Sequence, residues 1–164
     1  MATSKGIAFA ARRPLWAVSS LAALADDALQ ELANDQLFVH ADGVICAVLD
    51  ARRGEVFAGC FRHGAALVSE RVMAPSELAS WVAEVATLAR AAAPALAALT
   101  APGAPAAPAA PAVSFAGDAI EAHRVVLEPL AVHGPWLATR TPSGAAVARL
   151  PRARARVDVA LGGA

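Results

Sequence analysis

The segment that most constrains the fold is VICAVLDARRGEVFAGCF, residues 44–61, in which two apolar runs flank a short charged turn. The first run is apolar at successive positions, which predicts a central β-strand buried on both faces. The second run is β-branched and aromatic, which predicts the neighbouring strand. Residues 52–54 fit a three-residue hairpin loop with Gly54 in the left-handed conformation. This register places Cys46 opposite Cys60.

Apolar periodicity predicts helices and short strands on both sides of this hairpin. We expect helices over residues 1–13, 21–33 and 74–92, and a weak one over 141–157 interrupted by Pro151. We expect strands over residues 14–19, which should be buried, and over 65–73, 112–116 and 124–130. This order predicts an α/β protein with a mixed sheet. The Pro/Ala-rich residues 100–112 are predicted to form a flexible loop.

Two of the predicted helices have a clear apolar face. In the first, Ser19 or Ser20 is the cap, Asp26, Asp27 and Glu31 face water, and the following residues form the stripe: Leu21, Leu24, Ala25, Ala28, Leu29 and Leu32. In the second, Pro94 limits the helix, and its apolar face consists of Leu78, Trp81, Val82, Val85 and Leu88.

The overall composition narrows the classes of function. A formal net charge of 0 gives no general attraction to nucleic acid or to anionic membranes. Two cysteines without a spaced Cys/His pattern argue against a disulfide scaffold and against a structural zinc site. The longest alanine-rich stretch is broken by Pro and Gly, so no transmembrane helix is expected and a cytoplasmic location is predicted.

Two linked motifs resemble the TsaB family, also called YeaZ, the dimerisation partner in the bacterial complex that makes threonylcarbamoyladenosine on tRNA. They are KGIAFAARRPLWAVSSLAALA, residues 5–25, and VLDARRGEVFAGCF, residues 48–61. In the second, Phe57 replaces the usual Tyr. The later segments SFAGDA and PSGAAVARL are similar to the glycine turn and to the last helix of the family.

The resemblance implies an actin-like ATPase fold built from ribonuclease-H-like lobes. Residues 1–35 would be a remnant of the first lobe, and residues 43–164 would form the second lobe. Family members begin with further strands and a glycine-rich turn, and they end in a tail after the last helix. Neither has a counterpart here, so we expect a chain truncated at both ends.

The same resemblance implies a non-catalytic subunit that supports threonylcarbamoyl transfer to tRNA adenosine through a TsaD-type catalytic partner and a TsaE-type ATPase. ATP and metal would belong to the partners, with no cofactor, metal or catalytic residue in this chain. By the same resemblance, Thr3, Lys5 and Ile7 would be a remnant of the partner interface, so binding should be weak. Contact with tRNA would be indirect, a homodimer is permitted, and no membrane is involved.

The charged hairpin has two interpretations. Asp50, Arg52 and Glu55 could be a catalytic or tRNA-contacting cluster, or charges on a solvated turn. The family resemblance favours the second, in which these side chains fix the hairpin around Gly54. The alternative functions are a metal-dependent, glycoprotease-like hydrolase and a plain protein-interaction lobe. The hydrolase needs two histidines one helical turn apart, a spacing absent among His40, His63, His123 and His133.

Other side chains also have both a functional and a structural interpretation. Trp16 and Trp81 are expected in the core, whereas Trp136 is the more exposed candidate for stacking on nucleic acid. Cys46 and Cys60 are expected to be buried thiols rather than redox partners. A basic run could contact tRNA phosphates or form a solvated helix end; it comprises Arg149, Arg152, Arg154 and Arg156.

Overall fold

A five-stranded mixed sheet organises the chain in the computed structural model, which describes residues 2–34, 43–97, 111–130, 134–150 and 155–157. Its strands are β2 (Val44–Arg52), β3 (Glu55–Arg62), β4 (Ala65–Ala66), β5 (Arg71–Met73) and β6 (Val113–Ala116). The order is β4-β3-β2-β6, and β5 also pairs with β3. β2 runs antiparallel to β3 and parallel to β6. The predicted mixed sheet and the central position of β2 are therefore confirmed.

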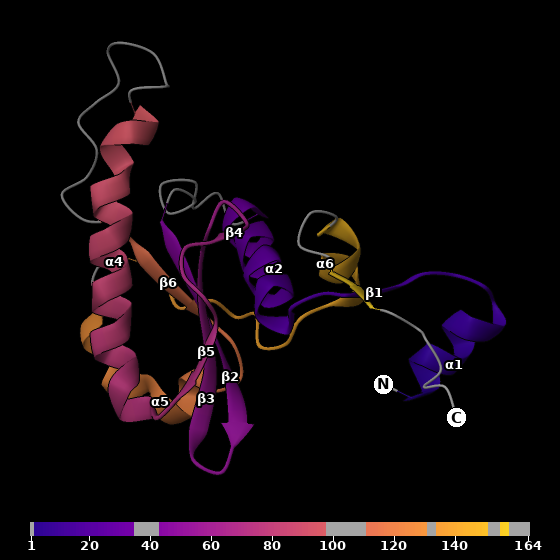
Figure 1. Cartoon of the computed structure of the whole chain (residues 1–164). Helices are drawn as coiled ribbons and strands as arrows, with labels where there is room; N and C mark the ends of the chain where they lie inside the picture. The colour runs from indigo at the N-terminus through magenta and orange to yellow at the C-terminus, as the bar shows by residue number, and fades with distance from the viewer. Residues whose placement is uncertain (1, 35–42, 98–110, 131–133, 151–154, 158–164) are drawn as a thin grey trace.

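Helices cover both faces of this sheet. Figure 1 shows α4 (Pro75–Ala97) on one side, and α2 (Ser20–Asn34) with α6 (Gly144–Arg149) on the other. α5 (Ile120–Leu127) and the short 3-10 helix η1 (Glu128–Leu130) adjoin α4. Alternation along β2 explains the layers, because Cys46 and Val48 pack into the core on the α4 side, whereas Ile45 and Ala47 pack into the core on the α2 side.

α2 forms where its apolar stripe was predicted. The Ser19 hydroxyl accepts a hydrogen bond from the Ala22 N–H at 3.2 Å, which caps the first turn. The buried residues are Leu21, Ala22, Ala23, Leu24, Ala25, Ala28 and Leu32. Leu29 is only partly buried at the edge of this set. The helix belongs to the predicted first-lobe remnant, yet it packs on the sheet of the predicted second lobe.

α4 differs from its prediction at two positions. Leu88 is 58% exposed, and Ala89 is buried instead, because Ala89 continues the spacing of four residues from Val85. Pro94 does not end the helix, which continues to Ala97. Proline has no backbone N–H to donate, but the residues on both sides of Pro94 keep the helical conformation.

The predicted strand over residues 124–130 is wrong, since these residues complete α5 and form η1. Ile120 and Leu127 lie on either side of a kink at His123, and both are buried, so they form the inward face of this helical segment. Val125 points away and is 85% exposed. The β-branched residues favoured a strand locally, but burial of this helical face decides the conformation.

A second, two-stranded sheet lies apart from the first. β1 (Leu15–Ala17) pairs antiparallel with β7 (Ala155–Val157), whose residues were predicted to be helical. The strand predicted over residues 14–19 is therefore present as β1, but its predicted burial is wrong, and so is the core position of Trp16, whose side chain is 47% exposed. β1 lies outside the two helical layers, which explains this exposure. α1 (Ala2–Ala10) stands beyond β1, away from the main sheet (Figure 1).

The remaining predictions fall partly outside the described residues. The predicted strand over 65–73 is present only as the two short strands β4 and β5. Of the Pro/Ala-rich loop at 100–112, the structure describes only the last two residues, and Pro151 is not among those described. Within the part of the chain that is described, no helix has both the length and the apolar character needed to cross a membrane.

Candidate functional site

The charged hairpin is a two-residue turn that follows a bulge. Arg52 pairs directly with Glu55, so Arg53 and Gly54 form the turn, and the register of the strands shifts between Asp50 and Arg52. Gly54 has the expected left-handed conformation, with a φ of 79°. Arg52 and Arg53 also have positive φ, at 68° and 55°. Positive φ at both turn positions matches the twist of paired strands, which explains why a shorter turn replaces the predicted three-residue loop.

Asp50 joins the bulge to the rest of the sheet. Its Oδ1 accepts a hydrogen bond from the Arg52 N–H at 2.7 Å, and its Oδ2 lies 3.7 Å from Arg52 Nη1. The backbone N–H of Asp50 donates to Asp118 Oδ1 at 3.0 Å, which links the hairpin to the turn after β6. Glu55 is exposed, and the described residues offer its carboxylate neither an ion pair nor a hydrogen bond. The arrangement therefore uses the Asp50 carboxylate as a backbone acceptor within the turn.

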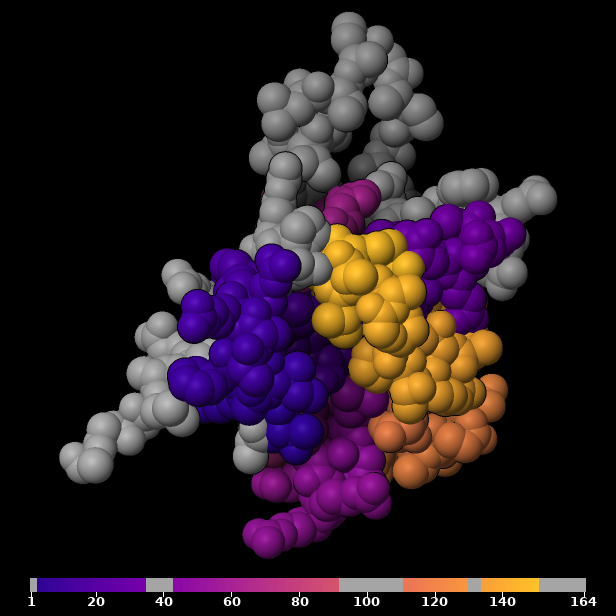
Figure 2. Space-filling view, turned by 90° about the vertical axis from the view of Figure 1, so that its right-hand side faces the viewer, coloured from indigo at the N-terminus to yellow at the C-terminus, as the bar shows by residue number. Residues whose placement is uncertain are grey.

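Three residues of α1 were singled out as an interface remnant, and all of them are exposed. Thr3 and Ile7 are four positions apart and share one helical face, whereas Lys5, two positions from each, lies on the opposite side. Ile7 is 66% exposed, and Phe9 is also exposed. Figure 2 shows the N-terminal residues, in indigo, on the face of the molecule that is turned toward the viewer. α1 thus presents unpaired apolar side chains to solvent.

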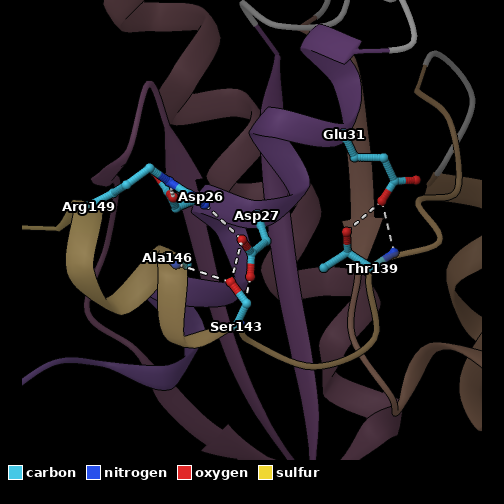
Figure 3. A network of polar contacts seen from close by, with 7 residues as sticks. All are labelled: Asp26, Asp27, Glu31, Thr139, Ser143, Ala146 and Arg149. Atoms are coloured by element: carbon cyan, nitrogen blue, oxygen red, sulfur yellow. Dashed lines mark hydrogen bonds and ion pairs between the residues drawn. The ribbon is translucent and has the colours of Figure 1, made fainter.

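A polar network that the sequence did not predict connects α2 to α6 (Figure 3). Arg149 Nε lies 2.7 Å from Asp26 Oδ2, and Arg149 Nη2 lies 2.8 Å from Asp27 Oδ1. The side chains of Asp26 and Asp27 are only 14% and 17% exposed. The prediction that these two carboxylates face water is therefore wrong, and Arg149, the first residue of the basic run, is 41% exposed and paired with both of them.

Ser143 extends this network at the start of α6. Its N–H donates to Asp27 Oδ2 at 2.7 Å, and its hydroxyl donates to Asp27 Oδ1 at 3.0 Å. The same hydroxyl accepts from the Ala146 N–H at 3.1 Å, which caps α6. Partial burial acts to raise the pKa of Asp27, but the bonds from Ser143 and then from Arg149 outweigh it, so this pKa lies below its ordinary value.

Glu31 forms a second connection from α2 and does not face water as predicted. Its carboxylate accepts hydrogen bonds from the Ala138 N–H at 2.6 Å, from the Thr139 N–H at 2.9 Å and from the Thr139 hydroxyl. The carbonyl of Thr139 in turn accepts from the Gly117 N–H at 2.9 Å. One sequence signal could have indicated this role, since Asp27 and Glu31 are one helical turn apart beside the apolar stripe.

The two histidines that the structure describes lie in different elements. His63 is exposed, with a φ of 50°, in the turn between β3 and β4, and His123 is partly buried where α5 is kinked. His40 and His133 are outside the described residues. Where the chain is described, no group of three or more His, Cys, Asp and Glu residues is placed to hold a metal ion.

Trp136 was the candidate for stacking on nucleic acid, but its ring is engaged within the protein. It stacks on Phe115, with ring centroids 5.3 Å apart and planes 25° apart. The Arg124 guanidinium lies 5.3 Å from the Trp136 ring centroid, within range of a cation–π interaction. Trp81 is buried against the sheet, as predicted.

One open pocket lies between β5 and α4, a place where the sequence indicated no site. Its volume is about 290 Å³, and its lining residues are Arg71, Val72, Met73, Glu77, Ser80, Trp81 and Glu84. Glu77 in this lining already accepts a hydrogen bond from the Ala74 N–H at 3.2 Å. The pocket holds charges of both signs and no buried polar group without a partner, so its lining indicates no particular ligand.

A sequence model of the family described as TsaD, tRNA N6-adenosine threonylcarbamoyltransferase, matches residues 1–160. The chain belongs to this family. The match includes both the charged hairpin and the α2–α6 network of the TsaD-family chain. Among curated proteins, none matches the sequence.

Two solved structures are similar to this TsaD-family chain. One is titled an uncharacterized protein with similarity to peptidase YeaZ from Pseudomonas aeruginosa, with 24% identity and a TM-score of 0.51; the match covers 96% of this chain and 61% of that one. The other is YeaZ from Pseudomonas aeruginosa, with 27% identity and a TM-score of 0.44, covering 73% and 42% of the two chains. The first likeness, with the family match and the mixed sheet, identifies the actin-like ATPase fold. This chain spans 61% of that structure.

The described residues of the TsaD-family chain do not fit a metal centre. Three carboxylates that could ligate a cation are committed elsewhere, Asp26 and Asp27 to Arg149, and Glu31 to Thr139. In the hairpin, Asp50 bonds to the backbone of Arg52. These groups hold segments of the fold together.

Proposed function

We propose that this chain is a TsaB-like (YeaZ-like) member of the TsaD family, which supports threonylcarbamoyl transfer to tRNA adenosine without performing the chemistry. The observation that carries this proposal is the family match over residues 1–160. The catalytic step would take place on a TsaD-type partner, which would also hold the metal and ATP. A TsaE-type ATPase would complete the set, and this chain would contact tRNA only through its partners.

The geometry of the charged hairpin supports a non-catalytic role. An acid or base must reach the proton that it transfers, so a free and positioned carboxylate is required. Asp50 is bonded to the backbone of its own turn, and Glu55 extends into solvent. Asp50, Arg52 and Gly54 thus serve the shape of the hairpin.

The exposed face of α1 is the proposed contact with the TsaD-type partner. Thr3 and Ile7 lie on this face, and the 66% exposure of Ile7 leaves a large apolar side chain available for burial. One short helix gives a small contact area, so we expect weak association. The same apolar face permits a homodimer, which would compete with partner binding.

The test is a reconstituted tRNA-modification reaction. A TsaD-type subunit, a TsaE-type ATPase, tRNA and a threonylcarbamoyl donor are incubated with increasing amounts of this chain, and threonylcarbamoyladenosine is measured by mass spectrometry. We expect product to increase with the chain, and no product when the TsaD-type subunit is left out. If the amount of product does not increase at any concentration of this chain, the supporting role is refuted.

Two variants locate the contact. Ile7→Asp places a charge on the exposed face of α1 and should abolish the increase, because burying an unpaired charge is costly. Val125→Asp is the matched control, since Val125 is also an exposed aliphatic residue, on α5. If both variants lose the increase in product equally, the contact does not lie on α1. Binding without any change in product would favour the plain interaction lobe, and metal-dependent hydrolysis by this chain alone would favour the hydrolase.

A further inference from the structure

The only two cysteines of the chain face each other across the β2–β3 pair. Cys46 and Cys60 are direct partners in the antiparallel register, as the sequence predicted, and their Sγ atoms are 2.6 Å apart. Both are free thiols buried in the core on the α4 side of the sheet. Direct antiparallel partners have Cα atoms about 4.5–5.5 Å apart, which is within the range of about 4.4–6.8 Å found for disulfides. The backbone therefore already has a spacing that a disulfide can bridge.

We propose that Cys46 and Cys60 form an intrachain disulfide when the protein meets a small peroxide. In the first step, the thiolate of one cysteine attacks a peroxide oxygen, the O–O bond breaks, and a sulfenic acid and a hydroxide form. In the second, the other thiol attacks the sulfenic sulfur, the S–S bond forms, and water leaves. Each cysteine loses one hydrogen atom, and one peroxide molecule is reduced to water. This inference does not depend on the proposed role in tRNA modification.

Burial makes the reaction slow and selective for small oxidants. Neither side chain is accessible to a bulky reagent. Burial, together with the contact to Cys60, raises the pKa of the Cys46 thiol, so little thiolate is present at neutral pH. The rate of oxidation should consequently rise with pH. The two thiols therefore stay reduced in a reducing compartment and become oxidised only under sustained exposure to peroxide.

The bond would fix the charged hairpin. It closes the loop from Cys46 to Cys60, which contains the bulge at Asp50 and the Arg53–Gly54 turn. A crosslink of this kind restricts the unfolded chain more than the folded one, so it raises the thermal midpoint. We expect the oxidised chain to melt several degrees above the reduced chain.

The experiment follows both thiols in the intact chain. The folded protein is treated with hydrogen peroxide, the free thiols are alkylated in denaturant, and the digested chain is examined by mass spectrometry. We expect a monomer lacking two hydrogen atoms, a crosslinked pair of peptides containing Cys46 and Cys60, and recovery of both thiols with dithiothreitol. A dose that oxidises the urea-unfolded chain but leaves both native thiols free would overturn the proposal. Separate sulfinic acids or disulfide-linked dimers would also overturn it.

The single variants Cys46→Ser and Cys60→Ser provide the control, with their fold verified by circular dichroism. Neither can form the intrachain bond, so peroxide should not raise the thermal midpoint of either variant. A rise of wild-type size in either would contradict a disulfide as its cause. The peptide map of the unsubstituted chain decides the proposal even if a variant fails to fold.

Discussion

Arg149 Nε lies 2.7 Å from Asp26 Oδ2, although 123 positions separate the two residues in the sequence. This ion pair connects α6 to α2. Ala146 is the only residue of α6 that is buried, so the helix contributes little apolar area to the core. Leu150, directly after the helix, is buried in the same apolar cluster as the α2 stripe, so the polar contacts with α2 add to a small apolar contact.

Replacing Arg149 should loosen this attachment. Arg149→Met removes the donor to Asp26 and Asp27 and leaves two neighbouring carboxylates without their cation. We expect a lower thermal midpoint, with a deficit that narrows in high salt because screening already weakens the native pair. Arg90→Met is the control, since Arg90 is exposed on α4 with no ion pair to the described residues. Equal midpoints for the two variants would contradict the structural role of Arg149.

Stability should fall in acid through Asp27. Its folded-state pKa is below its ordinary value, so the ionised carboxylate contributes stability that is fully present above the unfolded-state pKa. This contribution is lost as pH falls through the folded-state pKa. Asp27→Asn should cost about 1 kcal/mol at neutral pH and flatten the decline that begins as pH falls below the ordinary carboxylate pKa. Denaturant titrations at several pH values measure this difference, with Glu84→Gln as the exposed control. An unchanged acid profile in Asp27→Asn would exclude Asp27 as the cause.

The hairpin charges should affect stability unequally. Asp50→Ala removes the acceptor for the Arg52 N–H and should cost about 0.5–1 kcal/mol, because the exposed N–H can recover a bond to water. Glu55→Ala removes an exposed side chain and should change stability by less than about 0.5 kcal/mol. Urea unfolding compares the two. A larger loss for Glu55→Ala would mean that Glu55, and not Asp50, fixes the turn.

Gly117 should tolerate no side chain. Its φ is 130°, and a Cβ atom there would lie 1.9 Å from the Val48 carbonyl oxygen. Gly117→Ala should cost more than about 2 kcal/mol, since both strain and displacement of β2 contribute. Gly144→Ala, where a Cβ atom would meet open space, should be neutral or slightly stabilising because alanine favours the helix. Urea midpoints test both, and a mild effect at Gly117 would contradict the close packing of this turn on β2.

Local patterns predicted the central elements of this fold. Period-3.6 stripes located α2 and the first four turns of α4, and the apolar runs around Gly54 located β2 and β3 in the correct register. In each case the elements are adjacent in sequence or have a wide apolar face. The motifs at residues 5–25 and 48–61, taken together, also indicated a family of tRNA threonylcarbamoylation proteins, which agrees with the match to the TsaD family.

Long-range contacts explain what the sequence did not show. Asp26 and Asp27 looked like water-facing charges because their partners, Ser143 and Arg149, are more than a hundred positions away. The pairing of β1 with β7 likewise joins segments that are far apart in the sequence. The strand prediction for residues 124–130 failed for another reason. Their β-branched composition favoured a strand, and the helical face became evident only from packing against α4.

The measurement that tests the proposed function most directly is threonylcarbamoyladenosine formation with purified components. The account predicts that product appears only when a TsaD-type subunit is present and that this chain increases its amount. Product formed by this chain and tRNA without the TsaD-type subunit would contradict the non-catalytic role.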